Sequence, residues 1–206
     1  MSVDLSLRDV VTHRRTYIAM LVSSLASLIA SLVLSADAIT LAKNANSKLF
    51  CDINAVVSCG KVALSWQSNL LGFPNAFIGL ICEPVVITLA IAGLSRAQFP
   101  KWFMKTALAV YILGLSFALW LLSQSFFVIK AFCPWCLVVT ISTVTVFSTM
   151  LRVNLLDNTF NMSAAKHEKW TEFLKRGWDH VIVAGIYTIL VVAILVRYGK
   201  YFLPHF

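Results

Sequence analysis

The chain has 206 residues, of which 59% are hydrophobic and only 13% are charged, with a mean hydropathy of +0.82 and a formal net charge of +8. A soluble domain of this length cannot bury so much apolar surface, so the composition excludes a soluble globular protein and indicates a chain that crosses a membrane several times. The basic residues flank apolar runs and form no single patch, which argues against nucleic-acid binding and is typical of anchors near anionic lipid.

Five apolar segments follow one another along the chain, and each is long enough to cross a hydrocarbon layer of roughly 30 Å at about 1.5 Å per residue. A basic amino-terminal segment precedes the first, and this first apolar run is long for a signal peptide, so no signal peptide is expected. A polar stretch at 152–180, with an amphipathic portion, separates the fourth from the fifth. The predicted spans are 16–36, 75–95, 106–129, 131–151 and 181–198.

These spans predict one all-α integral membrane domain over residues 1–206, without repeats or low-complexity linkers. Lys and Arg are more numerous in the amino-terminal segment and in the loops at 96–105 and 152–180 than on the alternate side. Cytoplasmic loops carry the excess of Lys and Arg in membrane proteins. We therefore expect a cytoplasmic amino terminus, a cytoplasmic loop at 152–180 and an extracytoplasmic carboxyl terminus.

Two cysteines separated by Pro134 and Trp135 open the fourth predicted span. At a helix start, free backbone N–H groups and the helix dipole stabilise a thiolate on Cys133. Cys136 lies about 4.5 Å deeper along the same face. This layout suits the transfer of two electrons from a donor in water to an acceptor dissolved in the membrane. A zinc-bound pair is the alternative, but zinc needs four ligands and the histidines lie elsewhere, so no metal is expected.

A second cysteine pair, Cys51 and Cys59, lies in the loop after the first span. The loop allows a bond within the pair, or a bond from one member to Cys133 or Cys136. Thiol–disulfide exchange requires each sulfur to attack another in turn, so a mobile loop pair suits a shuttle, and a static structural disulfide is the plainer alternative. Cysteine pairs stay oxidised outside the cytoplasm, which places all four thiols on the outer face.

The second span opens with Asn75 and carries Glu83 in its interior. The Asn75 amide is able to donate a hydrogen bond to a quinone oxygen, and Phe77, Phe132 and Trp135 are candidates for the walls of a flat apolar slot. A helix cap is an equally natural role for an asparagine that follows a proline. An ionisable residue within a span is costly and therefore a functional candidate, whether Glu83 faces the helix bundle or snorkels to the cytoplasmic side.

Together these features resemble bacterial members of the vitamin K epoxide reductase family. The resemblance covers about residues 16–151 and implies a catalytic four-helix transmembrane bundle around a quinone, menaquinone or ubiquinone, with an outer loop and half-helix as a lid. The fifth helix is additional to that bundle. The motifs that carry the resemblance are Cys51-x7-Cys59, Ser65, Gly72-Phe73-Pro74-Asn75 and Cys133-Pro134-Trp135-Cys136.

The resemblance also implies a role for each site residue. Cys136 faces the quinone and Cys133 is its partner toward the loop, whereas Cys51 and Cys59 form the shuttle pair that meets the protein substrate. The remaining expected cofactor-site residues are Asn75, which hydrogen-bonds a quinone oxygen, Ser65, which supports the lid and the relay, and the slot residues Phe77 and Trp135.

The implied activity is that of a quinone-dependent thiol–disulfide oxidoreductase in a bacterial inner membrane, with its active site on the extracytoplasmic side. It reoxidises a thioredoxin-fold, DsbA-like protein and so supports disulfide formation in exported proteins. Many bacterial members carry a fused thioredoxin-like domain after the fifth span, and we expect a separate partner protein here. Thr140 stands where animal members have a tyrosine, which argues against their epoxide chemistry. Quinone epoxide reduction and a non-catalytic disulfide-bonded scaffold are the alternatives.

Overall fold

A computed structural model describes residues 2–54 and 56–202, and the side chains among them of residues 13–54 and 56–199. Within this part of the chain the regular structure is helical, apart from an isolated bridge between Val57 and Phe132. Five helices are long and apolar enough to cross a membrane, as expected for a multi-pass membrane protein. The elements are α1 (Ser2–Lys43), α2 (Cys59–Ala63), η1 (Trp66–Asn69), α3 (Ala76–Leu94), α4 (Lys101–Gln124), η2 (Ser125–Ile129), α5 (Pro134–Leu156), α6 (Ala164–Lys175) and α7 (Trp178–Phe202).

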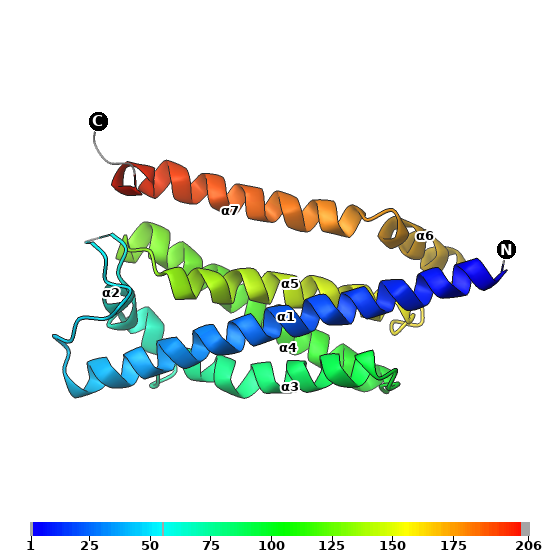
Figure 1. The fold of residues 1–206 in the computed structure, drawn as a ribbon, viewed down its shortest axis with the longest axis horizontal. Helices are drawn as coiled ribbons and strands as arrows, with labels where there is room; N and C mark the ends of the chain where they lie inside the picture. Colours follow the sequence, from blue (N-terminus) through cyan, green and yellow to red (C-terminus); the bar gives the residue numbers. More distant parts are fainter. Residues whose placement is uncertain (1, 55, 203–206) are drawn as a thin grey trace.

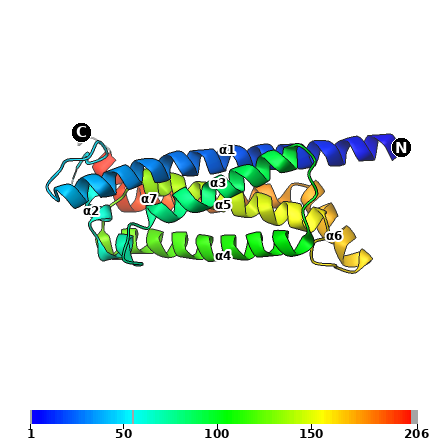
Figure 2. The ribbon, with the colours of Figure 1, turned by 90° about the horizontal axis from the view of Figure 1, so that it is seen from below.

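The long helices lie roughly side by side along the long axis of the molecule (Figure 1). α1 packs along α3 and α5, and α4 packs along α5. α7 lies on the side of α5 that is turned away from α3 (Figure 1). The short elements α2 and η1 gather at one end of the molecule, and α6 and the amino terminus lie at the other (Figure 2). The two ends of the molecule therefore have different structures.

The five predicted spans correspond to α1, α3, α4, α5 and α7, but several helices extend beyond their apolar parts. α1 begins at Ser2 and continues to Lys43, although the apolar segment is 16–36. α5 continues to Leu156, and α7 begins at Trp178. Polar residues are compatible with helix once the chain has left the hydrocarbon layer, so the apolar segment gives the span and not the helix ends.

Two glycines of α3 allow α1 to approach closely. A Cβ atom added to Gly79 would lie 2.1 Å from the Oγ of Ser31, and one added to Gly93 would lie 2.3 Å from the ring of Tyr17. Small residues at helix contacts are the usual basis of close packing in membranes, where burial from water does not drive helices together. The α1–α3 contact therefore depends on the absence of a side chain at these two positions.

The turn between α4 and α5 brings the Cys-x-x-Cys motif into position. The π-helical turn η2 ends at Lys130, which takes a left-handed conformation with a φ of 55° and reverses the chain. Cys133 then occupies the N-cap position of α5, and its Sγ accepts the N–H of Cys136 at 3.3 Å. Pro134 fills the first helical position, where its missing N–H leaves no hydrogen bond unmade.

The predicted amphipathic stretch before the fifth span forms α6. Leu174 is buried, and the rings of Trp170 and Phe173 contact each other with centroids 5.7 Å apart. Arg152, near the end of α5, donates to the Leu174 carbonyl at 3.0 Å and pairs with Asp179 at the start of α7. One buried guanidinium thus connects α5 with both later helices.

Candidate active site

The four predicted redox cysteines meet at the end of the molecule that carries α2. Cys51 and Cys59 form a disulfide, whereas Cys133 and Cys136 are free thiols. The Sγ of Cys133 lies 3.5 Å from the Sγ of Cys59. Sequence reasoning left open whether the loop pair bonds internally. The structure has the internal disulfide, with Cys59 as the member next to the Cys-x-x-Cys motif.

Two backbone hydrogen bonds dock the loop onto the segment that precedes α5. The N–H of Ser58 donates to the Phe132 carbonyl at 3.0 Å, and the N–H of Phe132 donates to the Val56 carbonyl at 2.6 Å. Since Cys59 follows Ser58 and Cys133 follows Phe132, this short pairing brings the two sulfurs together. The contact between the cysteine pairs is therefore set by the backbone.

Hydrogen bonds to Asp52 hold the loop closed around the Cys51–Cys59 disulfide. Its carboxylate accepts hydrogen bonds from the Ser58 hydroxyl at 2.7 Å and from the N–H groups of Gly60 and Leu49, both at 3.0 Å. Burial raises the pKa of Asp52, but the hydrogen bonds from Gly60, Ser58, Leu49 and Cys59 outweigh it and hold the pKa below its ordinary value. The Asp52 carboxylate is thus a structural anchor of the loop.

The surroundings of Cys133 stabilise its thiolate form. The hydrogen bond from the Cys136 thiol lowers the pKa of Cys133 most, and the N–H groups of Cys136 and Trp135 lower it further. Together they outweigh burial and the negative charge of Asp37, both of which raise this pKa. The thiolate predicted at the start of the helix has its stabilising N–H groups in place.

A cavity of about 550 Å³ lies among α1, α3, α4 and α5 and reaches Cys59, Cys133 and Cys136. Its size falls within the range of about 300–1,000 Å³ that is common for small-molecule and cofactor sites, and its wall is mostly apolar. The aromatic members of the wall are Tyr111, Phe117, Phe126, Phe132 and Tyr198.

Residues 18–151 match the sequence model of the vitamin K epoxide reductase family, and this segment contains all four site cysteines. The chain belongs to the vitamin K epoxide reductase family. It is therefore a multi-pass membrane protein of a quinone-linked oxidoreductase family, as the motifs suggested. The match ends before α6 and α7. No curated protein matches the chain.

The hydrogen bonds of the Asn75 side chain bear on whether the cavity fits the quinone that this family uses. Its Nδ2 donates to the Gln67 carbonyl at 2.7 Å, whereas its Oδ1 is buried and has no hydrogen-bond partner among the described residues. Asn75 lines the cavity and occupies the N-cap position of α3, where its side chain makes no capping hydrogen bond. The unpaired Oδ1 is an acceptor suited to a quinol hydroxyl, and Nδ2 has a second N–H besides the one that Gln67 accepts. With the apolar wall, this orphaned oxygen fits a quinone and its reduced form.

Three other residues that were predicted to contact the cofactor do not line the cavity in the described part of the chain. Ser65 donates to the Val62 carbonyl at 2.6 Å and so braces the turn between α2 and η1, in keeping with a role in the lid. Phe77 stacks on Phe73, with ring centroids 6.4 Å apart. Trp135 packs against the cluster that surrounds the loop disulfide. Of the three predicted slot aromatics only Phe132 is in the wall, because the other two rings are held by neighbours elsewhere.

Glu83 faces the helix bundle and does not snorkel toward the cytoplasmic side. The Ser27 hydroxyl of α1 donates to one carboxylate oxygen at 2.8 Å, and the Tyr111 hydroxyl of α4 donates to the other at 3.2 Å. Glu83 also lines the cavity. An acidic side chain within a span of this family member thus links three helices and borders the space between them.

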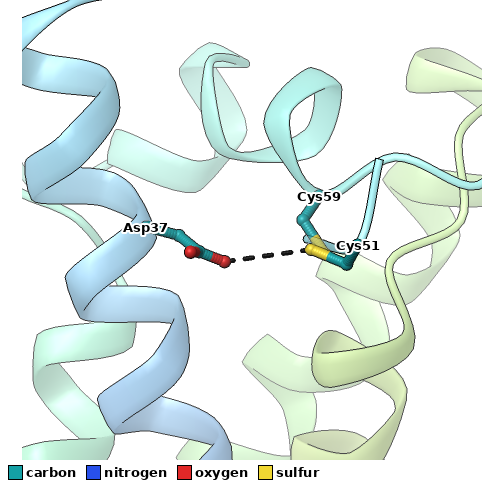
Figure 3. Close-up of side chains that lie close together, drawn as sticks. All are labelled: Asp37, Cys51 and Cys59. Carbon is teal, nitrogen blue, oxygen red and sulfur yellow. Dashed lines mark hydrogen bonds between the residues drawn. A yellow bond between two sulfur atoms is a disulfide. The ribbon is translucent and has the colours of Figure 1, made fainter. Parts of the chain in front are cut away.

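Sequence reasoning missed Asp37, which faces the loop disulfide from α1 (Figure 3). Its Oδ2 lies 3.8 Å from the Sγ of Cys51, and the ligand atoms of Asp37, Cys51 and Cys59 all lie within 4.8 Å of one another. Metals bind the thiolate form of cysteine, so these residues form no metal site while the disulfide is closed. The sequence did contain a sign of this position. Asp37 shares a helix face with Leu34 and Leu41, which pack on the hydrophobic cluster that contains Cys51 and Cys59.

Proposed function

We propose that the chain is a quinone-dependent thiol–disulfide oxidoreductase that reoxidises a separate thioredoxin-fold, DsbA-like partner and reduces menaquinone or ubiquinone to quinol. One observation carries the proposal: the sulfurs form a continuous path to the cavity. Cys133 lies 3.5 Å from Cys59 of the loop disulfide, Cys136 follows one helical turn along α5, and all three line the apolar cavity. A row of neighbouring sulfurs suits stepwise thiol–disulfide exchange, in which each thiolate attacks the next disulfide.

The proposed cycle has three balanced exchanges. The partner dithiol reduces the Cys51–Cys59 disulfide and becomes a disulfide itself. The loop dithiol then reduces a Cys133–Cys136 disulfide through attack of Cys59 on Cys133, which leaves a closed loop disulfide and two free thiols, the arrangement described here. The Cys133–Cys136 dithiol finally closes to a disulfide, and its two electrons and two protons leave with quinol. A bound quinone supplies the two-electron acceptor for that last step.

Exposed apolar residues beside Cys51 support a protein as the electron donor. Phe50 and Ile53 are 100% and 73% exposed, although they lie in the short loop that holds the disulfide. Exposed apolar side chains grouped on a surface are typical of protein-binding sites. Disulfide exchange with a secreted-protein oxidase also requires an oxidising compartment, which supports a bacterial inner membrane with the cysteines on the extracytoplasmic side.

Cysteine variants test the proposal in purified protein. Cys136→Ala is expected to abolish quinone-dependent reoxidation of the partner, because the Cys133–Cys136 disulfide can no longer form. Cys51→Ala and Cys59→Ala are expected to stop oxidation of the partner while a small dithiol still reduces quinone through Cys133 and Cys136. Wild-type protein stripped of quinone serves as the control and is expected to oxidise at most one partner molecule for each disulfide it holds, without turnover.

The alternatives give different results in the same experiments. Unchanged turnover in Cys136→Ala would remove the quinone assignment. Loss of both activities in the loop variants would show that the loop disulfide is structural. A single disulfide connectivity in thiol trapping, whatever the redox state of the quinone, would identify a scaffold, and turnover of a quinone epoxide would identify an epoxide reductase.

A further inference from the structure

α7 lies outside the segment that matches the family, yet it places a residue in the cavity wall. Most of α7 is exposed: Leu195 and Val196 are 58% and 82% exposed, as expected for a helix that faces lipid. Tyr198 is only 3% exposed and lines the cavity. The helix therefore turns one aromatic side chain inward at the end that carries the cysteines.

Tyr198 contacts the two chain segments that border the cavity near Cys133. Its ring centroid lies 5.5 Å from that of Phe126 in η2 and 6.0 Å from that of Phe132, the residue before Cys133. Its hydroxyl donates to the Ser125 carbonyl of η2 at 3.2 Å. These three neighbours also line the cavity. The ring of Tyr198 thus fills the space between the end of α4 and the segment that leads into α5.

We propose that α7 completes the quinone site and that Tyr198 is a quinone-binding residue, in addition to any role of this helix in anchoring the chain. The inference rests on the proposed function, because it takes the cavity to be the quinone site. The ring centroids of Tyr198 and its neighbours lie within the distances at which aromatic rings stack or meet edge to face. The hydroxyl is already engaged by the Ser125 carbonyl, so the ring is the part available to a flat apolar ligand.

Tyr187 provides a matched control on the same helix. Its hydroxyl donates to the Ile141 carbonyl at 3.1 Å and bonds the Thr145 hydroxyl, so it attaches α7 to α5 as Tyr198 attaches α7 to η2. Tyr187 does not line the cavity in the described part of the chain. A change at Tyr187 therefore tests attachment of the helix, and a change at Tyr198 tests attachment together with the cavity wall.

The experiment measures binding of short-chain ubiquinone and short-chain menaquinone to purified, quinone-free protein, by the ligand-dependent rise in its unfolding temperature. Tyr198→Ala and Tyr198→Leu are expected to weaken binding about tenfold, because a contact of the ring with the ligand is lost. Tyr198→Phe keeps the ring and is expected to bind within about twofold of wild type, as is Tyr187→Ala. Steady-state assays are expected to show the loss at Tyr198 in KM for quinone, with kcat little changed.

Two results would overturn the inference. Equal affinity in wild type, Tyr198→Ala and Tyr198→Leu would show that the ring does not contact the ligand. Equal weakening in Tyr187→Ala would show that only the attachment of α7 matters. If Tyr198→Ala fails to fold, Tyr198→Leu decides the question because it keeps much of the bulk. Absent quinone turnover in wild type would overturn the proposed function alone, since the binding measurement still reports on Tyr198.

Discussion

The two sulfurs of the loop disulfide have different neighbours, and the difference bears on which one leaves when the bond opens. Cys59 lies next to the Cys133 thiol at 3.5 Å, whereas Cys51 lies 3.8 Å from a carboxylate oxygen of Asp37. Two unit negative charges at about 4 Å repel by about 1 kcal/mol in water and by about 4 kcal/mol at the effective dielectric constant typical near a protein surface. Asp37 therefore disfavours a thiolate on Cys51, and it lies within 4.8 Å of Cys59 as well, so the bias toward a thiolate on Cys59 is a small difference between two repulsions.

Replacement of Asp37 tests this directing effect. In Asp37→Asn the repulsion disappears, so Cys51 in a Cys59→Ala background is expected to be alkylated about three- to tenfold faster at a fixed pH near 7. Asp52→Asn is the control, because the Asp52 carboxylate is turned to Ser58, Gly60 and Leu49, and it is expected to change the rate less. An equal acceleration in both variants, or none in Asp37→Asn, would contradict the assignment.

The residues that sequence reasoning found and missed differ in how far their roles depend on packing. Cys133 was placed correctly at a helix start, because Pro134 and the adjacent apolar run determine that start locally. Asp37 was missed because the apolar run ends at Ala36 while the helix continues to Lys43. Phe77 was expected in the cavity wall, but whether an aromatic ring faces the cavity or a neighbour depends on the rotation of its helix, which composition does not specify.

At the scale of helices, Glu83 joins three of the elements that enclose the cavity. It lies on α3 and accepts hydrogen bonds from Ser27 of α1 and Tyr111 of α4. A buried hydroxyl left without its acceptor costs about 1–3 kcal/mol. The Glu83 carboxylate therefore helps to fix the positions of α1, α3 and α4 relative to one another.

Replacement of Glu83 is therefore expected to loosen the bundle. Glu83→Ala leaves both hydroxyls unpaired and is expected to lower the free energy of unfolding by about 2–4 kcal/mol, whereas Glu83→Gln keeps an acceptor and is expected to lose about 1 kcal/mol. Thermal unfolding in detergent measures the loss. Ser116→Ala is the control, because Ser116 is exposed and bonds only within its own helix, to the Ile112 carbonyl at 2.8 Å. Glu83→Ala with wild-type stability would contradict a structural role.

The sequence predicts the membrane-spanning helices better than it predicts the loop structure between them or the side chains that reach the cavity. All five spans were located, because hydrocarbon thickness imposes a length and a composition that are visible in any apolar run. The resemblance implied an outer loop with a half-helix, and the structure has two short helices there, α2 and η1, with Ser65 between them. The position of Tyr198 in the cavity wall was also missed, since an aromatic near a span end is equally consistent with an interfacial anchor.

At the scale of the whole molecule, the site cysteines and the segments with the most Lys and Arg lie at opposite ends. The loop disulfide and α2 are at one end, and the amino terminus and α6 are at the other (Figure 2). The amino-terminal segment and the stretch that contains α6 are rich in Lys and Arg. Since such segments remain in the cytoplasm, we expect the sulfurs to face the extracytoplasmic side.

Labelling of single introduced cysteines tests this orientation. In a background without native cysteines, Ile53→Cys in the outer loop and Ser163→Cys before α6 both occupy exposed positions. A maleimide that does not cross membranes is expected to label Ile53→Cys in intact cells and Ser163→Cys only after the cells are disrupted. Both variants are expected to react to the same extent after disruption, which controls for intrinsic reactivity. Labelling of Ser163→Cys in intact cells, with Ile53→Cys protected, would reverse the orientation and place the disulfide in a reducing compartment, where the proposed relay could not stay oxidised.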